Sequence, residues 1–332
     1  MSPQPPCRVG LTRDLLTAAG TPSFGTAALA LLEDDPLIEW EFLPENVDEI
    51  TPQIAARYDV LHVNTPRVTA ASVASADRRV KLVSRHGVGY DAVDVAALAA
   101  QGVIATHTPV AVRRPVAVAA LTFIFALAGR LLEKDRMTRT GRWNDRTGAM
   151  GLGLTTRTLG VIGAGGIGQE LLALARPFGW RMLAADPYVN PAAVAALGAE
   201  CVALEQLLQA SDFVVATVLL NTHTRHLMNA ERFAQMKRSA YFINLSRGPI
   251  TDEAALIAAL KQGVIAGAGL DVFEQEPIAP DNPLLKMDNV LVTPHALCWT
   301  DECFDAIARE ALGGIVDFAN GRRPRSVIAA PA

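Results

Sequence analysis

The sequence has only four cysteines among its 332 residues, and no two of them stand in C-x-x-C spacing. This sparse use of cysteine excludes the disulfide framework of a small secreted domain and favours a reduced, cytoplasmic setting. Neither sign of charge dominates either, since the net charge is −4 and the isoelectric point lies near 5.9. Such a balance gives no reason to expect a nucleic-acid partner.

The sequence also lacks a clear targeting or membrane-spanning segment. The N-terminal stretch 1–8 has no apolar core of the kind found in signal peptides. One apolar run, Pro115 to Gly129, would cover about 22 Å as a helix, which is short of the roughly 30 Å hydrocarbon core of a bilayer. Arg113, Arg114 and Arg130 flank it closely. We therefore predict a buried helix here, a soluble protein and no membrane partner.

What the sequence does have is an apolar content of 50% and enough length for two domains of ordinary size. Near its middle, a short apolar strand at 158–162 leads into G-x-G-x-x-G, formed by Gly163, Gly165 and Gly168. In a dinucleotide-binding loop these glycines make a tight turn, let the backbone approach a pyrophosphate, and allow close packing of helix on strand. The start of the following helix offers free N–H groups and a positive dipole end to the phosphates.

An acidic residue follows at the distance that such a site requires. Trp180 to Ala185 reads as the next strand, and Asp186 stands at its end, where a carboxylate can bond the adenosine ribose. A carboxylate would repel a 2′-phosphate, and no Arg or Lys follows closely, so NAD is favoured over NADP. We assign to the coenzyme the residues Gly163, Gly165, Gly166, Ile167, Gly168 and Asp186.

Short β-like runs alternate with helical stretches on both sides of this motif, which predicts parallel, doubly wound α/β units. Strands are expected at 8–12, 39–43, 59–63, 80–84, 103–106, 158–162, 180–185, 213–217, 240–244, 265–270 and 290–293. The clearest helices are expected at 26–33, 115–132, 137–143, 252–262 with Thr251 as its cap, and 301–320. From the residues alone, the last helix could pack on either unit.

A second glycine loop, Arg85 to Asp91, follows the strand at 80–84. Ligands bind at the carboxyl ends of strands in open α/β sheets, and a loop with two glycines there can present N–H groups to a carboxylate. The alternative is an ordinary turn in which glycine supplies a positive φ. Val88 and Gly89 are candidate substrate residues, and the neighbouring His86 either lines the same site or is structural.

Three successive strand ends after the first glycine motif carry polar residues. Arg247 follows the strand at 240–243, Glu276 follows 264–270, and His295 follows 290–292. Hydride addition to a carbonyl leaves an alkoxide that needs a proton, and histidine is well suited to donate one near neutral pH. A carboxylate can fix the imidazole tautomer, and arginine can clamp a substrate carboxylate with two hydrogen bonds. We predict that these three residues are catalytic.

The blocks that hold these residues read Gly-Ala-Gly-Gly-Ile-Gly (163–168), Asn-Leu-Ser-Arg-Gly-Pro-Ile-Thr-Asp-Glu (244–253), Gly-Leu-Asp-Val-Phe-Glu-Gln-Glu-Pro (269–277) and Thr-Pro-His (293–295). They resemble the signature blocks of the D-isomer-specific 2-hydroxyacid dehydrogenases and occur in that family's order. The loop at 87–91 resembles the family's substrate-carboxylate loop. The resemblance covers nearly the whole chain.

The resemblance implies an oxidoreductase that transfers a hydride between NAD and a small 2-oxo or D-2-hydroxy acid. Arg247 would bind the carboxylate and carbonyl of the substrate, His295 would be the acid/base, and Glu276 would be its partner. Asp271 would sit near the nicotinamide carboxamide. The residues expected beside the coenzyme thus also include Ser246, Arg247, Asp271 and His295.

Two Rossmann-like domains are implied as well, with the coenzyme domain inserted into a discontinuous, flavodoxin-like substrate-binding domain. The expected ranges are 1–107 and 296–332 for substrate binding and 108–295 for NAD binding, with the active site in the cleft. A homodimer through the coenzyme domain is expected. The nearest types are glyoxylate/hydroxypyruvate reductases and phosphoglycerate dehydrogenases in a short form without the regulatory domain, so serine feedback is not expected.

Two places depart from the family's usual pattern. Val118-Ala119-Ala120 stands where Val-Ala-Glu is common, and Val218-Leu219-Leu220-Asn221 stands where Leu-Pro-Leu-Thr is usual. Both blur the subfamily, and the identity of the 2-oxo acid and the physiological direction stay open. Two other functions also stay open, a phosphite-type anion dehydrogenase and an NAD-sensing, corepressor-like interaction protein.

A few further residues have both a sharp and a plain interpretation. His223 and His226 have metal-like spacing but fall in an expected loop without a third ligand, so no metal site is predicted. Trp299 either forms a wall of the substrate pocket, limiting the size of the substrate's side chain, or plays no part in it.

Overall fold

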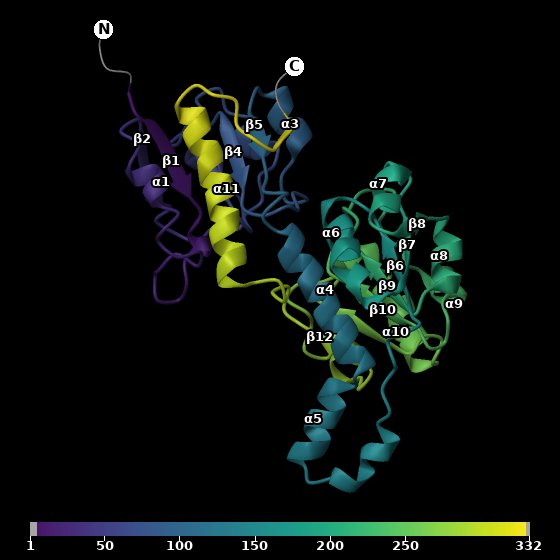
Figure 1. Cartoon of the computed structure of the whole chain (residues 1–332). Coiled ribbons are helices and arrows are strands. Elements are labelled where there is room, and N and C mark those ends of the chain that lie inside the picture. The colour runs from purple at the N-terminus through teal and green to yellow at the C-terminus, as the bar shows by residue number, and fades with distance from the viewer. Residues whose placement is uncertain (1–4, 330–332) are drawn as a thin grey trace. The chain divides into compact units, whose positions relative to one another are not determined.

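The structure is a computed structural model that describes residues 5–329. The first half of the N-terminal stretch discussed above and the last three residues of the predicted substrate-binding segment lie outside the described residues. The chain divides into two compact units, unit 1 with residues 1–112 and 299–332 and unit 2 with residues 113–298 (Figure 1). The boundaries expected from the sequence were 107/108 and 295/296.

Unit 1 is built on one sheet with helices beside it. Its elements are β1 (Cys7–Leu11), α1 (Ala30–Glu33), β2 (Ile38–Phe42), α2 (Pro52–Ala55), β3 (Val60–Val63), β4 (Leu82–Arg85), α3 (Val95–Ala100), β5 (Ile104–Thr106), α11 (Asp301–Ala319) and β13 (Val327–Ala329). The strand order is β13-β5-β4-β3-β1-β2. Strands β1 to β5 pair in parallel, whereas β13 runs antiparallel to β5. The order 2-1-3-4-5 is that of a flavodoxin-like, doubly wound sheet.

The closing helix α11 belongs to unit 1, which settles where it packs. Ala308, Leu312 and Ile315 share a buried core with Val9 and Leu11 of β1, and the helix contacts α1 and β4 (Figure 1). The helix begins where the Thr300 hydroxyl accepts a hydrogen bond from the Cys303 N–H at 3.1 Å. A core contributed by both ends of the chain makes unit 1 discontinuous.

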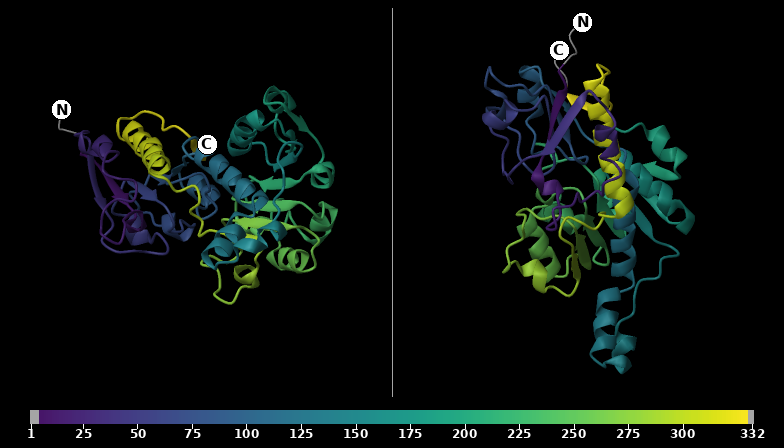
Figure 2. Two further views of the ribbon diagram at one scale, coloured as in Figure 1. Left: turned by 60° about the horizontal axis from the view of Figure 1, so that its bottom comes forward. Right: turned by 90° about the vertical axis from the view of Figure 1, so that its left-hand side faces the viewer.

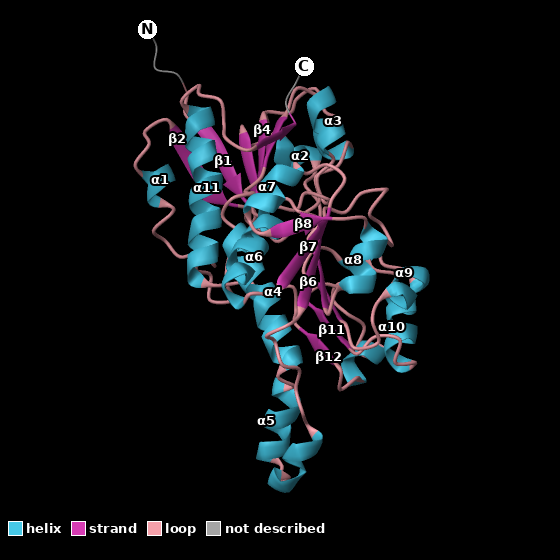
Figure 3. Cartoon of the chain, turned by 45° about the vertical axis from the view of Figure 1, so that its right-hand side comes forward, coloured by secondary structure: helices cyan, strands magenta, loops and turns pink. Residues whose placement is uncertain are grey.

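Unit 2 is built on a second, larger sheet. Its elements are α4 (Arg113–Ala128), α5 (Leu131–Arg139), β6 (Thr158–Ile162), α6 (Gly166–Ala175), β7 (Arg181–Ala185), α7 (Pro191–Ala196), β8 (Ala199–Cys201), α8 (Leu204–Ala210), β9 (Phe213–Ala216), α9 (Ala230–Gln235), β10 (Tyr241–Asn244), α10 (Glu253–Lys261), β11 (Gly267–Leu270) and β12 (Val290–Val292). The seven strands run in the order β12-β11-β10-β9-β6-β7-β8 and all pair in parallel. This is the dinucleotide-binding strand order, extended by β12, with its switch point between β6 and β9 (Figure 1). Figure 3 shows the helices of unit 2 beside this sheet. The predicted fold class is confirmed.

The apolar run at 115–129 forms most of α4, a helix of the unit 2 core. Phe123 and Ile124 are buried, and a Cβ on Gly269 of β11 would lie 2.8 Å from the Phe123 ring, so the helix lies directly on the sheet. Among residues 5–329, no single helix is long and apolar enough to cross a membrane. The pair α4 and α5 passes that test of length and composition only when taken together, with a bend of 56° between them.

The predicted helices at 115–132 and 137–143 were wrong in their boundaries. Helix α4 ends at Ala128, because Arg130 adopts a left-handed backbone with φ 50°. Helix α5 then occupies 131–139, and 143–148 is a short 3₁₀ helix. Figure 2 shows α5 continuing beyond α4, away from the sheet of unit 2. Only Met137 of α5 is buried. The helix therefore lacks the repeating pattern of apolar residues from which its boundaries could be predicted.

The cap of α10 was also assigned to the wrong residue. The side chain of Asp252, not of Thr251, accepts a hydrogen bond from the Ala255 N–H at 3.0 Å. Thr251 is buried, and its hydroxyl accepts a hydrogen bond from the Asn244 side chain at 3.2 Å. The three-residue strands β8 and β13 were not predicted, because so short a run carries no period of its own.

Candidate active site

The glycine motif after β6 has a distinct geometry at each glycine. Gly163 has φ 91°, a left-handed conformation that L side chains rarely adopt. A Cβ on Gly168 would lie 2.2 Å from the Gly163 carbonyl oxygen, so α6 and the turn are in direct contact. A Cβ on Gly165 would meet nothing within 4 Å. The second glycine therefore faces open space, where a pyrophosphate could approach the backbone.

The residues around this turn fit the polar groups of a dinucleotide. Gly165 precedes α6 without any side-chain cap, so no side chain caps the N–H groups of the first turn; those of Gly166 and Ile167 are the ones predicted to meet phosphate oxygens. Asp186, at the end of β7, accepts hydrogen bonds from Ala164 N–H at 2.8 Å and Tyr188 N–H at 2.9 Å. These bonds hold the carboxylate beside the glycine turn, where a ribose would lie.

Arg247 lies in a turn that its neighbours fix. Asn244, buried at the end of β10, accepts from Ser246 N–H at 2.9 Å and donates to the Arg247 carbonyl at 2.9 Å. The Ser246 hydroxyl donates to the Ala216 carbonyl at the end of β9, at 2.7 Å. The turn is thus anchored to two adjacent strands. These bonds fix the backbone position from which the Arg247 side chain extends.

His295 and Glu276 form a hydrogen-bonded pair. The His295 Nδ1 atom lies 2.7 Å from Glu276 Oε2, and the side chains are 42% and 36% exposed. Because a carboxylate only accepts, Nδ1 carries the hydrogen, and Nε2 is left to face a reacting atom. The other carboxylate oxygen of Glu276 accepts from Phe273 N–H at 2.9 Å.

The surroundings of Glu276 favour its charged form. Partial burial on its own would raise the pKa of the Glu276 carboxyl, but the hydrogen bonds from His295 and Phe273 and the positive charge of Arg247 outweigh it, so that the pKa lies below its ordinary value. A carboxylate that stays ionised beside an imidazole stabilises the imidazolium.

Asp271 holds the turn that contains His295. Its carboxylate is buried and accepts hydrogen bonds from the Thr293 hydroxyl at 2.6 Å, Ala296 N–H at 2.9 Å and Leu297 N–H at 3.1 Å. His295 lies in the middle of that turn and has φ 54°. These bonds tie the turn to β11 and explain why residues 296–298 belong to unit 2. The predicted place of Asp271 near the nicotinamide stays a prediction.

In unit 1, the second glycine loop is fixed by residues just after β5. Gly87 has φ 113°, and its N–H donates to the Thr108 hydroxyl at 2.8 Å. The His107 imidazole donates to the Val88 carbonyl at 2.9 Å. The backbone of this loop is therefore held in place on one side, while the N–H groups of Val88 and Gly89 are the ones predicted to meet a carboxylate.

His86 is more deeply buried than a typical pocket residue, with 3% of its surface exposed. Its Nδ1 atom lies 3.1 Å from Nε2 of the buried His62, and its ring lies 5.8 Å from the ring of Phe304 on α11. Trp299 is 58% exposed and rests with its ring 5.0 Å from that of Phe304. The predicted substrate roles of His86 and Trp299 stay predictions.

A second histidine–glutamate pair was not foreseen. His226 Nε2 lies 2.6 Å from Glu274 Oε1, two residues before the glutamate that bonds His295. The spacing of His223 and His226 singled out His226 as a possible metal ligand, but no sequence pattern linked it to Glu274. Among the described residues, no group of three or more His, Cys, Asp or Glu side chains is arranged to hold a metal ion.

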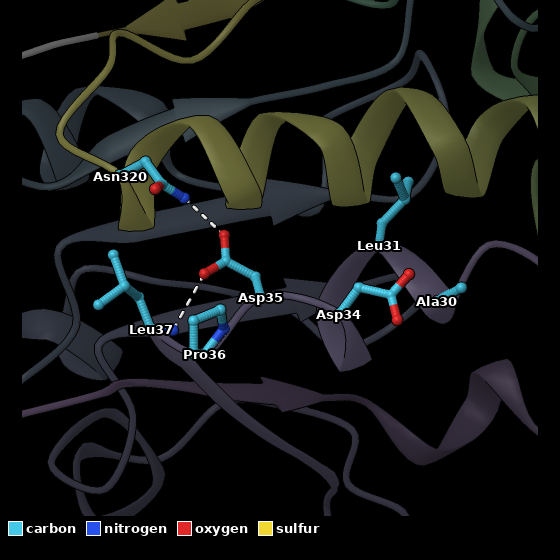
Figure 4. A pocket seen from close by; sticks show the side chains of 7 residues that line it. All are labelled: Ala30, Leu31, Asp34, Asp35, Pro36, Leu37 and Asn320. Atoms are coloured by element: carbon cyan, nitrogen blue, oxygen red, sulfur yellow. Dashed lines mark hydrogen bonds between the residues drawn. The ribbon is translucent and has the colours of Figure 1, made fainter.

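A surface pocket lies in unit 1 between α1, the segment 34–37 that leads into β2, and Asn320 after α11 (Figure 4). Its Asp35 carboxylate accepts hydrogen bonds from Leu37 N–H at 3.0 Å and from the Asn320 side chain at 2.6 Å. The acidic group is thus engaged within the protein, and none of the residues predicted to act in catalysis lines this pocket.

The chain is similar to known proteins in sequence and in fold. The sequence profile of the family described as "D-isomer specific 2-hydroxyacid dehydrogenase, NAD binding domain" matches residues 121–296. The chain is 40% identical to a glyoxylate reductase of Korarchaeum cryptofilum, over 78% of this chain and 79% of that protein. It is 36% identical to a glyoxylate reductase of Thermococcus onnurineus, over 89% and 88%. Its fold is similar to a D-lactate dehydrogenase of Aquifex aeolicus solved with NAD and lactic acid, with TM-score 0.85, 25% identity, and coverage of 98% and 100%.

Proposed function

This chain belongs to the D-isomer-specific 2-hydroxyacid dehydrogenases, and from that premise we propose that it reduces a small 2-oxo acid such as glyoxylate. It is an NAD-dependent oxidoreductase with a hydroxyacid dehydrogenase function of the glyoxylate reductase type. The observation that carries the detailed proposal is the His295–Glu276 pair at 2.7 Å. In the sheet order β12-β11-β10, Glu276 follows β11 and His295 follows β12, while Arg247 follows the neighbouring β10.

The proposed chemistry assigns one task to each residue. NADH, when bound, would supply the hydride for the carbonyl carbon. His295, as imidazolium, donates its Nε2 proton to the carbonyl oxygen, while Glu276 keeps the ring oriented through Nδ1 and stabilises its positive charge. In the oxidative direction neutral His295 removes the hydroxyl proton, so oxidation is favoured at higher pH than reduction.

The substrate carboxylate is assigned to Arg247 and to the second glycine loop. A guanidinium offers two parallel donors that match a carboxylate. In unit 1, the N–H groups of Val88 and Gly89 are proposed to add donors, with His86 and Trp299 near the substrate's side chain. We also propose that unit 1 is the substrate-binding domain and unit 2 the coenzyme domain.

We further propose NAD as the preferred coenzyme, a homodimer formed through unit 2, and a cytoplasmic setting. Asp186 supports the first, because a carboxylate at the ribose repels a 2′-phosphate. Exposed apolar side chains on and after α5 support the second, with Leu131, Leu132 and Trp143 each more than half exposed. The four free cysteines support the third. No nucleic-acid partner is proposed.

Two other functions compete with this proposal. An NAD-sensing, corepressor-like protein would need the coenzyme site but no paired acid and base, so the His295–Glu276 geometry favours an enzyme. A phosphite-type anion dehydrogenase would also use a guanidinium and a base, and only its substrate distinguishes it.

A substrate panel tests the proposal directly. Purified protein is assayed for NADH and NADPH oxidation with glyoxylate, hydroxypyruvate and pyruvate, and for NAD reduction with phosphite. We expect turnover with at least one 2-oxo acid and a higher kcat/KM with NADH than with NADPH. Turnover with phosphite alone, or NADH binding without turnover of any acid, would reject it.

A further inference from the structure

The turn after β11 carries two glutamates, and each of them bonds a histidine. Glu276 bonds His295 at 2.7 Å, and Glu274 bonds His226 at 2.6 Å. Both histidines have a left-handed backbone, with φ 51° at His226 and φ 54° at His295. Such a conformation is uncommon outside glycine and is retained only where the surrounding contacts determine it. Only the His295 pair has a role in the proposed reaction.

The backbone of His226 is attached to the segment that follows Arg247. His226 N–H donates to the Pro249 carbonyl at 2.8 Å, and Met228 N–H donates to the Ile250 carbonyl at 3.0 Å. The imidazole of His226 therefore reaches from the arginine segment to the glutamate turn. Its side chain joins the two elements that carry the proposed substrate clamp and the proposed acid/base pair.

The same two elements also touch through their backbones. A Cβ on Gly248, the residue after Arg247, would lie 1.8 Å from the Phe273 carbonyl oxygen and 2.4 Å from the Glu274 nitrogen. The Glu274 N–H donates to Glu253 at 3.1 Å. The turn is thus held at its backbone by Gly248 and Glu253, and at its side chain by His226.

We propose that His226 and Glu274 are a positioning pair that fixes the 273–277 turn against the Arg247 segment, and thereby sets the Glu276–His295 pair at its working distance from Arg247. The inference rests on the proposed function, since it assigns a role relative to those three residues. Neither His226 nor Glu274 contacts the reacting atoms in this account.

The exposure of the pair separates this role from a purely stabilising one. The side chains of His226 and Glu274 are 44% and 36% exposed, and exposed ion pairs contribute little to the free energy of unfolding. Loss of the pair should therefore leave the melting temperature nearly unchanged. A small displacement of catalytic groups, in contrast, costs a large factor in rate.

The test compares His226→Ala, Glu274→Ala, the double variant and His226→Gln with the wild type, using glyoxylate and NADH. His223→Ala is the matched control, because that histidine is exposed on the same loop three residues earlier. We expect each single alanine variant to lower kcat roughly 10- to 100-fold, with the KM for NADH and the melting temperature unchanged. The double variant should lose no more than a single one, because the two residues act together. Glutamine can still donate to Glu274, so His226→Gln should recover much of kcat.

The pH profile of kcat/KM supplies a second readout, which would not change if His226 and Glu274 only stabilised the fold. If the turn loosens, Glu276 supports the imidazolium of His295 less well, so the alkaline limb of kcat/KM for reduction should shift to lower pH in His226→Ala. Unchanged kcat and pH profile in that variant, or additive losses in the double variant, would overturn the inference. A wild type that turns over no 2-oxo acid would reject the proposed function instead, and the two failures are thus distinguishable.

Discussion

His62 and His86 form a buried chain of hydrogen bonds whose direction is fixed by a carbonyl group. His62 Nδ1 lies 3.0 Å from the Ser84 carbonyl oxygen, which can only accept, so Nδ1 carries the hydrogen. Neutral His62 then accepts at Nε2 from His86 Nδ1 at 3.1 Å. It follows that neutral His86 presents a lone pair, not an N–H, at its own Nε2. If His86 meets a substrate, it can accept a hydrogen bond from a hydroxyl but cannot donate one to a carboxylate.

Both imidazoles should make unit 1 sensitive to acid. Burial lowers the pKa of His62 from 6.5 to about 4 and lowers that of His86 well below 6.5. A lowered pKa in the folded state means that the unfolded chain binds more protons at mildly acidic pH. The contribution of these histidines to the free energy of unfolding is therefore fully present above pH 6.5 and is lost as the pH drops toward 4. At about 1.4 kcal/mol per pKa unit, the His62 shift corresponds to roughly 3 kcal/mol.

We therefore expect the melting temperature of the wild type to fall more between pH 7 and pH 5 than that of His62→Asn, whose side chain does not titrate. Differential scanning calorimetry at several pH values measures both. Equal pH dependence in the two proteins would show that His62 binds no additional proton on unfolding.

At the level of single residues, the sequence allowed predictions where chemistry limits the choice of side chain. The pairing of His295 with Glu276 was implied by the family resemblance and fits the need of an acid/base histidine for a carboxylate at its other nitrogen, and the structure has them in contact. The turn-holding role of Asp271 and the His226–Glu274 pair were not foreseen. Both depend on contacts between residues more than 20 positions apart that follow no local period.

Among the elements, the glycine turn before α6 offers a matched pair of substitutions. Gly165 has φ −71°, which any residue adopts, and its Cβ would face open space, whereas a Cβ on Gly168 would lie 2.2 Å from the Gly163 carbonyl. We expect Gly165→Val to keep the melting temperature but to weaken NADH binding at least about 10-fold, because the side chain would occupy the pyrophosphate's place.

Gly168→Val should instead lower the melting temperature, because its side chain would collide with the Gly163 carbonyl. Calorimetry and NADH fluorescence titration measure the two effects, and tight NADH binding by a folded Gly165→Val would contradict the assigned cofactor site.

Element boundaries show what local patterns can and cannot predict. Strands β6, β7, β9, β10 and β11 were found because buried parallel strands are continuous apolar runs. Helix α5 was misplaced because Met137 is its only buried residue, and an i,i+4 ion pair, Arg139 with Asp135 at 2.8 Å, supports it instead of a buried apolar face. The cap of α10 was misassigned because Thr251 and Asp252 are both capping residues, and only the tertiary bond from Asn244 to Thr251 distinguishes them.

For the whole molecule, the proposed dimer can be tested by substitutions in helix α5. Leu131 and Leu132 are 58% and 57% exposed, and such adjacent exposed leucines are typical of an interface. We expect Leu131→Asp/Leu132→Asp to convert a dimer to a monomer in sedimentation velocity. Leu37→Asp on unit 1, where the side chain is 39% exposed, should leave the dimer intact. A wild type that sediments as a monomer would reject the proposal.

The division into two units is the feature of the whole chain that a sequence reveals least directly. Alternating strands and helices predict two doubly wound sheets, but they do not say which unit the last helix joins. That depends on α11 burying Leu312 and Ile315 in the same core as Val9 and Leu11 of β1, a core shared by opposite ends of the chain. Only the family resemblance predicted it.

The central claim is that His295, oriented by Glu276, supplies the proton in the reduction of a 2-oxo acid. Its most direct test is the kcat of His295→Ala for glyoxylate reduction by NADH, measured alongside the dissociation constant for NADH. General acid catalysis is worth roughly 10² to 10⁴ in rate, so we predict a loss of that size in kcat with NADH affinity preserved. A folded His295→Ala protein that retains the wild-type kcat would contradict the account.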